Sequence, residues 1–171
     1  PQSGKGEMYN VTVKEDSVVQ VKITGDTIPY VDAYELHRKQ GSGSFTFIDS
    51  IQQPANPEDT FIFYDTVGTT EDILCYKVRT YRPCMSIQTS DTFCATQLSG
   101  QGQNQANLLT WEPFHGYSVD SQYVLRANNA TYDTLAKISG ADTSFTDTGL
   151  TCNVPRTYKV LSFEKGGNRQ S

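Results

Sequence analysis

Phe145-Thr-Asp-Thr148 followed by Tyr158-Lys-Val-Leu-Ser-Phe163 repeats an earlier pair of segments, Phe63-Tyr-Asp-Thr66 followed by Tyr76-Lys-Val-Arg-Thr-Tyr81. The interval from Asp65 to Tyr76 is 11 positions, and the interval from Asp147 to Tyr158 is also 11. Because this interval includes a connecting loop, chance rarely produces such a match, and self-similarity of this kind marks a repeated structural unit. We therefore expect two copies of one module, spanning residues 1–96 and 97–171.

Each copy reads as a series of short β-strands. In the strand that begins at Tyr76, alternation places Tyr76, Val78 and Thr80 on one face. Another matched pair of segments, Tyr34-Glu-Leu-His-Arg38 and Tyr123-Val-Leu-Arg126, precedes the repeat in each copy. Further candidate strands are residues 9–13, 18–23, 31–38, 45–51, 60–64 and 87–93 in the first copy, and 108–111, 122–126, 134–138 and 144–145 in the second. Their spacing is typical of β-sandwiches, so the expected fold class is all-β with two tandem sandwiches.

Composition agrees with this fold class and excludes several functions. At 171 residues the chain has room for two small domains, and its 10 Tyr and 8 Phe stand beside many Thr, Val, Ser and Gly, which favour strands and turns. The net charge of -5 leaves no basic surface for a phosphate backbone, so we expect no nucleic-acid partner. No apolar run approaches the roughly 20 residues of a membrane helix, so we expect no membrane insertion. The start at Pro1 lacks the layout of a signal peptide, and any targeting signal is expected outside this sequence.

Three stretches are expected to connect strands or copies. Residues 97–106 carry no charge and lie between the copies, so they form either a linker or a first strand of the second copy with a polar outer face. Gly41-Ser-Gly-Ser44 fits a hairpin loop better than a phosphate-binding loop. The first copy holds a longer insertion, which we place around residues 52–57.

The second copy resembles fibronectin type III domains in the order of four segments: Leu109-Thr-Trp-Glu-Pro113, Tyr123-Val-Leu-Arg126, Phe145-Thr-Asp-Thr-Gly-Leu150 and Tyr158-Lys-Val160. The resemblance implies an immunoglobulin-like β-sandwich with Trp111 in the core of its second strand and Tyr158 opening its sixth. Tyr76 is the counterpart of Tyr158 in the first copy. Leu150 lies farther from Tyr158 than in the family's pattern, so the corner between strands five and six is expected to be longer.

The first copy departs further from the fibronectin type III pattern. It has no Trp, so Val21 or Ile23 is expected to fill the place of Trp111. The pattern Leu74-Cys-Tyr-Lys-Val78, Cys84 and Ser90-Asp-Thr-Phe-Cys94 resembles modules of large surface and gliding-associated proteins of Bacteroidetes. This resemblance implies export by the type IX secretion route and an extracellular or cell-surface location.

Four cysteines, Cys75, Cys84, Cys94 and Cys152, lack the C-x-x-C pairs of zinc or redox sites, so disulfides are the simpler interpretation. If residues 76–81 and 87–93 form an antiparallel hairpin turning near Cys84, residues whose numbers sum to about 169 face each other. Cys75 and Cys94 satisfy that sum, and we expect them to be bonded. Cys84 and Cys152 are expected to be free or paired outside this sequence, because they belong to different copies.

The sequence offers little material for catalysis. His37 and His115 are the two histidines, and we expect both to be exposed without a role. Asp65 and Asp147 are the most attractive carboxylates, but they occupy equivalent places in both copies. A structural role, an Asx-turn or a hydrogen bond at the strand-five corner, fits this repetition better than an active site does. A calcium site at a module boundary is the alternative for these carboxylates. We expect no enzyme, no cofactor and no metal.

Two functions remain: a structural or adhesive spacer of a larger secreted or cell-surface bacterial protein, related to gliding or adhesion, or an accessory carbohydrate-binding module of a secreted hydrolase. Partners are neighbouring domains and an unidentified protein or glycan. Exposed coplanar aromatic rings would favour the carbohydrate-binding function, and the candidates are Tyr30, Tyr117, Tyr123 and Tyr132, although alternation places Tyr123 inward. Residues 54–59 form a possible binding loop, and glycosylation triplets begin at Asn10 and Asn129. We favour the spacer.

Overall fold

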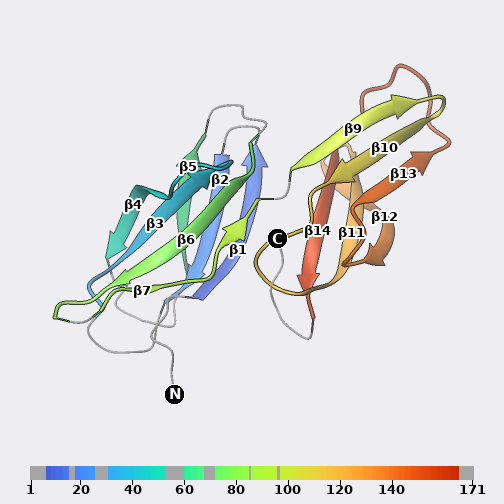
Figure 1. Cartoon of the computed structure of the whole chain (residues 1–171). Helices are drawn as coiled ribbons and strands as arrows, with labels where there is room; N and C mark the ends of the chain where they lie inside the picture. Colours follow the sequence, from blue (N-terminus) through green and yellow to red (C-terminus); the bar gives the residue numbers. More distant parts are fainter. Residues whose placement is uncertain are drawn as a thin grey trace. The chain divides into compact units, whose positions relative to one another are not determined.

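The structure, a computed structural model, describes residues 7–15, 18–25, 31–52, 60–67, 72–84, 86–95 and 97–165. These ranges contain the strands β1 to β14 and no helix. The chain divides into two compact units, residues 1–95 (unit 1) and 96–171 (unit 2), one residue before the boundary expected from the sequence (Figure 1). No helix among the described residues is long and apolar enough to span a bilayer.

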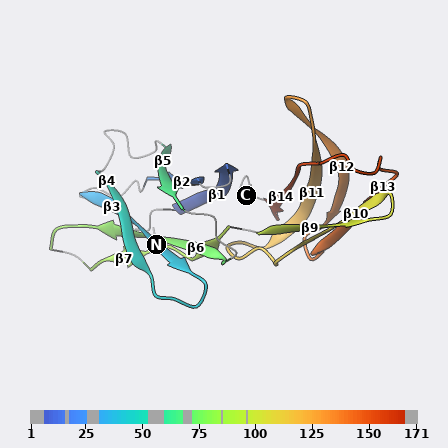
Figure 2. The same ribbon diagram turned by 90° about the horizontal axis from the view of Figure 1, so that it is seen from above.

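Unit 1 consists of two antiparallel sheets, seen as separate layers in Figure 2. One sheet has the order β1-β2-β5, and the other has the order β4-β3-β6-β7, with β8 also paired to β6. The strands are β1 (Glu7–Glu15), β2 (Val18–Thr24), β3 (Ala33–Gln40), β4 (Thr46–Gln52), β5 (Thr60–Thr66), β6 (Leu74–Tyr81), β7 (Gln88–Thr89) and β8 (Phe93–Cys94). The hairpin expected at residues 41–44 joins β3 to β4.

The core of unit 1 lies between its two sheets, where alternate residues of each strand point inward. The fully buried side chains include Val19, Val21 and Ile23 of β2, Phe63 of β5, Tyr34 and Leu36 of β3, and Tyr76, Val78 and Thr80 of β6. The predicted inward face of β6 is therefore confirmed. Burial of each large apolar side chain contributes roughly 1.5 to 3 kcal/mol to the free energy of folding. The alternation of apolar residues with a period of two is therefore the main determinant of the sandwich.

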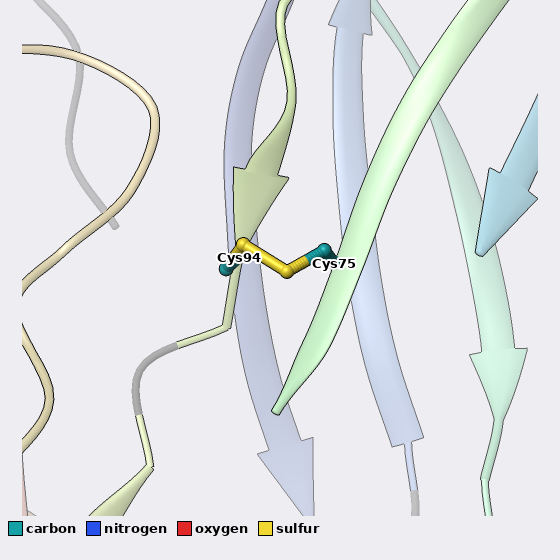
Figure 3. The surroundings of a disulfide bond; sticks show 2 residues. All are labelled: Cys75 and Cys94. Carbon is teal, nitrogen blue, oxygen red and sulfur yellow. A yellow bond between two sulfur atoms is a disulfide. The ribbon is translucent and has the colours of Figure 1, made fainter. Parts of the chain in front are cut away.

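A disulfide joins Cys75 of β6 to Cys94 of β8, the pairing that the hairpin register predicts (Figure 3). The two residues are register partners, as are Tyr76 and Phe93. The expected single strand over residues 87–93 is instead two short strands, because the Ser90 hydroxyl accepts the Val78 N–H at 2.9 Å. A side chain thus replaces a carbonyl in the ladder, and the register beyond it shifts by one residue.

Unit 2 repeats the two-sheet arrangement with fewer strands among its described residues. Its sheets have the orders β13-β10-β9 and β12-β11-β14. The strands are β9 (Leu98–Gln103), β10 (Ala106–Trp111), β11 (Val119–Asn128), β12 (Thr131–Ser139), β13 (Ser144–Thr148) and β14 (Tyr158–Glu164). β9 settles the alternative left open for residues 97–106: they contain a first strand of the second copy, paired along β10 and largely exposed.

The core of unit 2 is smaller and centres on Leu109, Trp111 and Val124. Trp111 is buried, and its indole N–H donates to Gln122 Oε1 at 2.8 Å. Gln122 in turn donates to the carbonyl of Gly140 at 3.0 Å. Six partly buried apolar side chains pack around the core: Leu98, Leu135, Ile138, Phe145, Tyr158 and Val160. Tyr158 thus lies at the border of the core, whereas its counterpart Tyr76 is fully buried.

Register identifies the residue that replaces Trp111 in unit 1. Val19 pairs with Asp65 as Asn107 pairs with Asp147, so four positions further along each strand Ile23 corresponds to Trp111. The smaller Ile23 is accompanied by an aromatic pair, Tyr34 and Phe61, with ring centroids 4.8 Å apart. Both units are sandwiches of two antiparallel sheets, and the predicted fold class, all-β with two tandem immunoglobulin-like sandwiches, is confirmed.

Candidate functional site

A buried arginine–aspartate–tyrosine cluster links the two sheets of unit 1. Asp65 lies on β5, whereas Arg38 and Tyr76 are register partners on β3 and β6 of the other sheet. Arg38 Nη1 donates to both carboxylate oxygens of Asp65 at 2.9 Å. The Tyr76 hydroxyl donates to Asp65 Oδ2, also at 2.9 Å. All three side chains therefore meet across the interior of the sandwich.

Unit 2 contains the same cluster at the equivalent positions. Asp147 lies on β13, and Arg126 and Tyr158 are register partners on β11 and β14. Arg126 Nη1 donates to Asp147 Oδ2 at 2.8 Å, and the Tyr158 hydroxyl donates to the same oxygen at 2.9 Å. The repeated interval in the sequence is thus the interval between the aspartate and the tyrosine of one inter-sheet cluster.

The two clusters differ in one neighbour. Asn107 of β10 donates to the Tyr158 hydroxyl at 2.9 Å, whereas the corresponding residue in unit 1 is Val19, which offers no donor. Burial, and next the charge and hydrogen bond of Asp65, raise the pKa of Tyr76 well above its ordinary value. Burial also raises the pKa of Tyr158, but the hydrogen bond from Asn107 opposes that increase.

These clusters join the two sheets of each unit through a buried carboxylate. The side chains of Asp65 and Asp147 are only 5% and 8% exposed, and each carboxylate is occupied by its arginine and tyrosine. A buried charge of this kind is stable only with its partners in place. The expected Asx-turn or corner position is wrong, because both aspartates lie within strands and their bonds cross between sheets.

Raising the pH above about 10 is expected to destabilise unit 1 through Tyr76. An unfolded tyrosine ionises near pH 10, whereas folded Tyr76 keeps its proton because its pKa is raised. The unfolded state then binds fewer protons, so stability is complete below pH 10 and falls above it by about 1.4 kcal/mol per pH unit. Urea unfolding at pH 9 to 11, followed by circular dichroism, measures this slope. The Tyr76→Phe variant should lose that part of the slope, and an unchanged slope would contradict the assignment.

The expectation that both histidines are exposed is wrong for His37. Only 6% of His37 is accessible, although it lies on the outer face of β3. Glu35 lies 3.1 Å from its Nε2, and the Phe47 ring packs edge-on against it with centroids 5.9 Å apart. Its neighbours on this face thus cover it, because a β-sheet brings residues from adjacent strands together. His115 is exposed, as expected.

The aromatic candidates for sugar binding that the structure describes do not form a coplanar platform. The inward orientation expected for Tyr123 is wrong: its neighbours Gln122 and Val124 are the buried residues, and Tyr123 packs on Phe163 with the rings inclined at 63°. Tyr117 donates its hydroxyl to the Ser162 carbonyl and contacts Phe114 at 43°. These inclined and hydrogen-bonded rings do not present parallel faces. Tyr132 is 38% exposed beneath the Lys159 ammonium.

The remaining candidates add no ligand site within the described residues. Tyr30 and the loop at residues 54–59 lie outside the described residues. Asn129 is exposed in the turn between β11 and β12, and Asn10 accepts a hydrogen bond from Thr12. Cys84 and Cys152 are exposed and unpaired. Within the ranges that the structure describes, no group of three or more His, Cys, Asp or Glu side chains is arranged to hold a metal ion.

A lysine stacks on an aromatic ring on the outer face of each unit, a contact that was not predicted from the sequence. Lys77 Nζ lies 4.1 Å from the centroid of Phe45, and Lys159 Nζ lies 4.2 Å from that of Tyr132. Both lysines follow the repeated tyrosine, so the alternation that places the tyrosine inward already places them outward. Phe45 lies in the β3–β4 connection just before β4, and Tyr132 lies on β12, so spacing along the lysine's own strand could not identify these ring partners.

No protein-family model and no curated protein matches this chain. Solved structures do resemble it. A segment of two fibronectin type III domains from chicken tenascin matches 98% of this chain and 94% of its own length, with 15% identity and a TM-score of 0.38. The FN1–FN3 domains of chicken CNTN1 match 98% of this chain and 66% of their own, with 13% identity and a TM-score of 0.36. The central fibronectin III array of RIM-binding protein matches 95% and 64%, with 11% identity and a TM-score of 0.41. Each is an array of fibronectin type III domains, the module that the sequence resembles.

Proposed function

We propose that this chain is a non-catalytic structural segment that acts as a spacer in a larger secreted or cell-surface protein. The observation that carries the proposal is the repeated arginine–aspartate–tyrosine cluster. In each unit, the carboxylate that is the strongest catalytic candidate in the sequence, Asp65 or Asp147, joins the two sheets of that unit. A chain built from two such sandwiches is suited to setting the distance between neighbouring domains and to presenting its loops and sheet faces to other molecules.

The disulfide supports an extracellular or cell-surface location. Cys75 and Cys94 are each 6% exposed, and structural disulfides of this kind persist mainly in oxidising compartments. The resemblance of the cysteine pattern to surface and gliding-associated proteins of Bacteroidetes favours a bacterial surface, export by the type IX route and a role in adhesion or gliding. Neighbouring domains of such a protein, or a protein or glycan ligand, would be the partners.

Force spectroscopy of the chain held at both ends tests the spacer function. We expect two separate unfolding events, one for each unit, because each unit has its own core. The disulfide spans 19 positions, so reductant should lengthen the unit 1 step by about 65 Å at roughly 3.5 Å per residue. The unit 2 step should stay unchanged.

The control is the Cys75→Ser/Cys94→Ser variant, whose unit 1 step should already be long without reductant. A single event for the whole chain, or extension without any force peak, would show that the units do not bear load independently. Either result would reject the spacer function.

A further inference from the structure

The outer face of the β3–β6 sheet in unit 1 gathers three cations. Lys77 and Arg79 are alternate residues of β6, about 7 Å apart along the strand, and Lys39 lies on β3 beside them. Register pairs Lys39 with Cys75, and Lys77 with His37, so all three cations point to the same face. We call Lys39, Lys77 and Arg79, together with Phe45 and Phe47, the cationic face.

The charges of the cationic face are not neutralised within the described residues. None of its three cations forms an ion pair there. On β3, β4 and β6, register places Glu35 on the same face, where it bonds His37. Asp49 of β4 pairs instead with the inward Leu36, because the register shifts between Leu36 and His37. Residues 1–95 as a whole contain 13 Asp and Glu against 8 Lys and Arg. Among the described residues, this cluster of unpaired cations is therefore a local feature of an acidic unit, and its charge is complementary to that of an anionic partner.

Aromatic rings lie among these cations. Lys77 Nζ and Lys39 Nζ lie 4.1 and 5.8 Å from the centroid of Phe45. Phe47 stands against His37 with 56% of its surface exposed. Burial, and next the charge of Arg79, lower the pKa of Lys77, as expected for an ammonium with no anion beside it. The surface therefore offers apolar rings and cations side by side.

We propose that the cationic face binds an acidic polysaccharide with one carboxylate on each sugar. Such a polymer presents charges at regular intervals, which suits cations at successive outward positions of one strand and its neighbour. The apolar C–H faces of its sugars can cover the exposed ring of Phe47 while the carboxylates pair with Lys77 and Arg79. An acidic polypeptide offers the charges without rigid sugar faces and loses more side-chain entropy on binding. The proposal goes beyond the spacer function. The force measurement tests load bearing and the titration tests ligand binding, so either can fail while the other succeeds.

Calorimetric titration of the full chain with an oligogalacturonate of defined length tests the proposal. We expect binding at low salt that weakens as salt screens the charges, and no binding of the methyl-esterified oligosaccharide, which keeps the sugars but lacks the carboxylates. Lys77→Gln and Arg79→Gln should each weaken affinity about fivefold, and the double variant about 25-fold. Phe47→Ala should weaken affinity without changing the salt dependence.

Matched controls lie elsewhere in the chain. Lys159→Gln removes the equivalent stacked lysine of unit 2, and Tyr64→Ala removes a ring that is 60% exposed on the other sheet of unit 1. Both should leave affinity unchanged, and circular dichroism checks that every variant is folded. Unchanged affinity in Lys77→Gln/Arg79→Gln, or no binding at low salt, would overturn the proposal. Polyglutamate of equal charge binding as tightly would assign the face to acidic peptides and would overturn it too.

Discussion

Replacing Asp65 by Ala is expected to lower the free energy of unfolding of unit 1 by about 3 to 5 kcal/mol. The substitution leaves the Arg38 guanidinium, whose side chain is 24% exposed, without its counter-charge between the sheets. It also removes the acceptor of the fully buried Tyr76 hydroxyl, and no other hydrogen bond of that hydroxyl is present among the described residues. Urea unfolding followed by circular dichroism should show the unit 1 transition moving to lower urea, while Trp111 fluorescence, which reports unit 2, stays unchanged.

The matched variant in unit 2 separates the effect of the charge from that of the hydroxyl. Asp147→Ala removes the same carboxylate, but Asn107 still bonds the Tyr158 hydroxyl and Arg126 is 29% exposed. Its cost should be smaller, about 2 to 3 kcal/mol. The double variant Asp65→Ala/Arg38→Met should recover part of the loss in unit 1, because the unpaired charge is removed as well. Equal losses in the single and double variants would contradict the buried ion pair.

Trp111→Ala is expected to destabilise unit 2 by about 3 to 5 kcal/mol. Among the described residues, Trp111 is one of three buried apolar residues at the centre of this core, so few apolar neighbours can collapse into the space it leaves. Its loss also leaves Gln122 Oε1 without its indole donor at a position that is 1% exposed. Calorimetry should then show the melting transition of unit 2 at a lower temperature, with the transition of unit 1 unchanged.

Trp111→Phe and Ile23→Ala serve as controls for this prediction. Trp111→Phe keeps most of the side-chain volume but removes the N–H. Its smaller loss of unfolding free energy, about 1 to 3 kcal/mol, therefore measures the cost of leaving the Gln122 oxygen without a donor. Ile23→Ala creates the equivalent cavity in unit 1 and should move only that unit's transition. A Trp111→Ala chain in which unit 2 melts as before would show that the indole does not support the core.

Much of the fold could be predicted from local pattern. The interval from Asp65 to Tyr76, repeated from Asp147 to Tyr158, identifies two copies because both ends of the interval contribute to one contact. The disulfide was also predictable, because a hairpin register is set by arithmetic once its turn is placed. The break between β7 and β8 was not, since it depends on the hydroxyl of Ser90 replacing a backbone carbonyl.

The sequence by itself determined most of the strands, the two copies, the Cys75–Cys94 pair and the inward face of β6, because these follow from the repeat, from a period of two or from short-range register. Only the tertiary structure decided that Asp65 reaches Arg38 in the opposite sheet, that His37 is covered by Phe47, and that Lys77 stacks on Phe45. These contacts join residues from different strands or from a connection between strands, and packing of the whole sandwich sets which of them come together. The period of a strand determines which face a side chain lies on, whereas its contacts depend on how the strands and sheets pack.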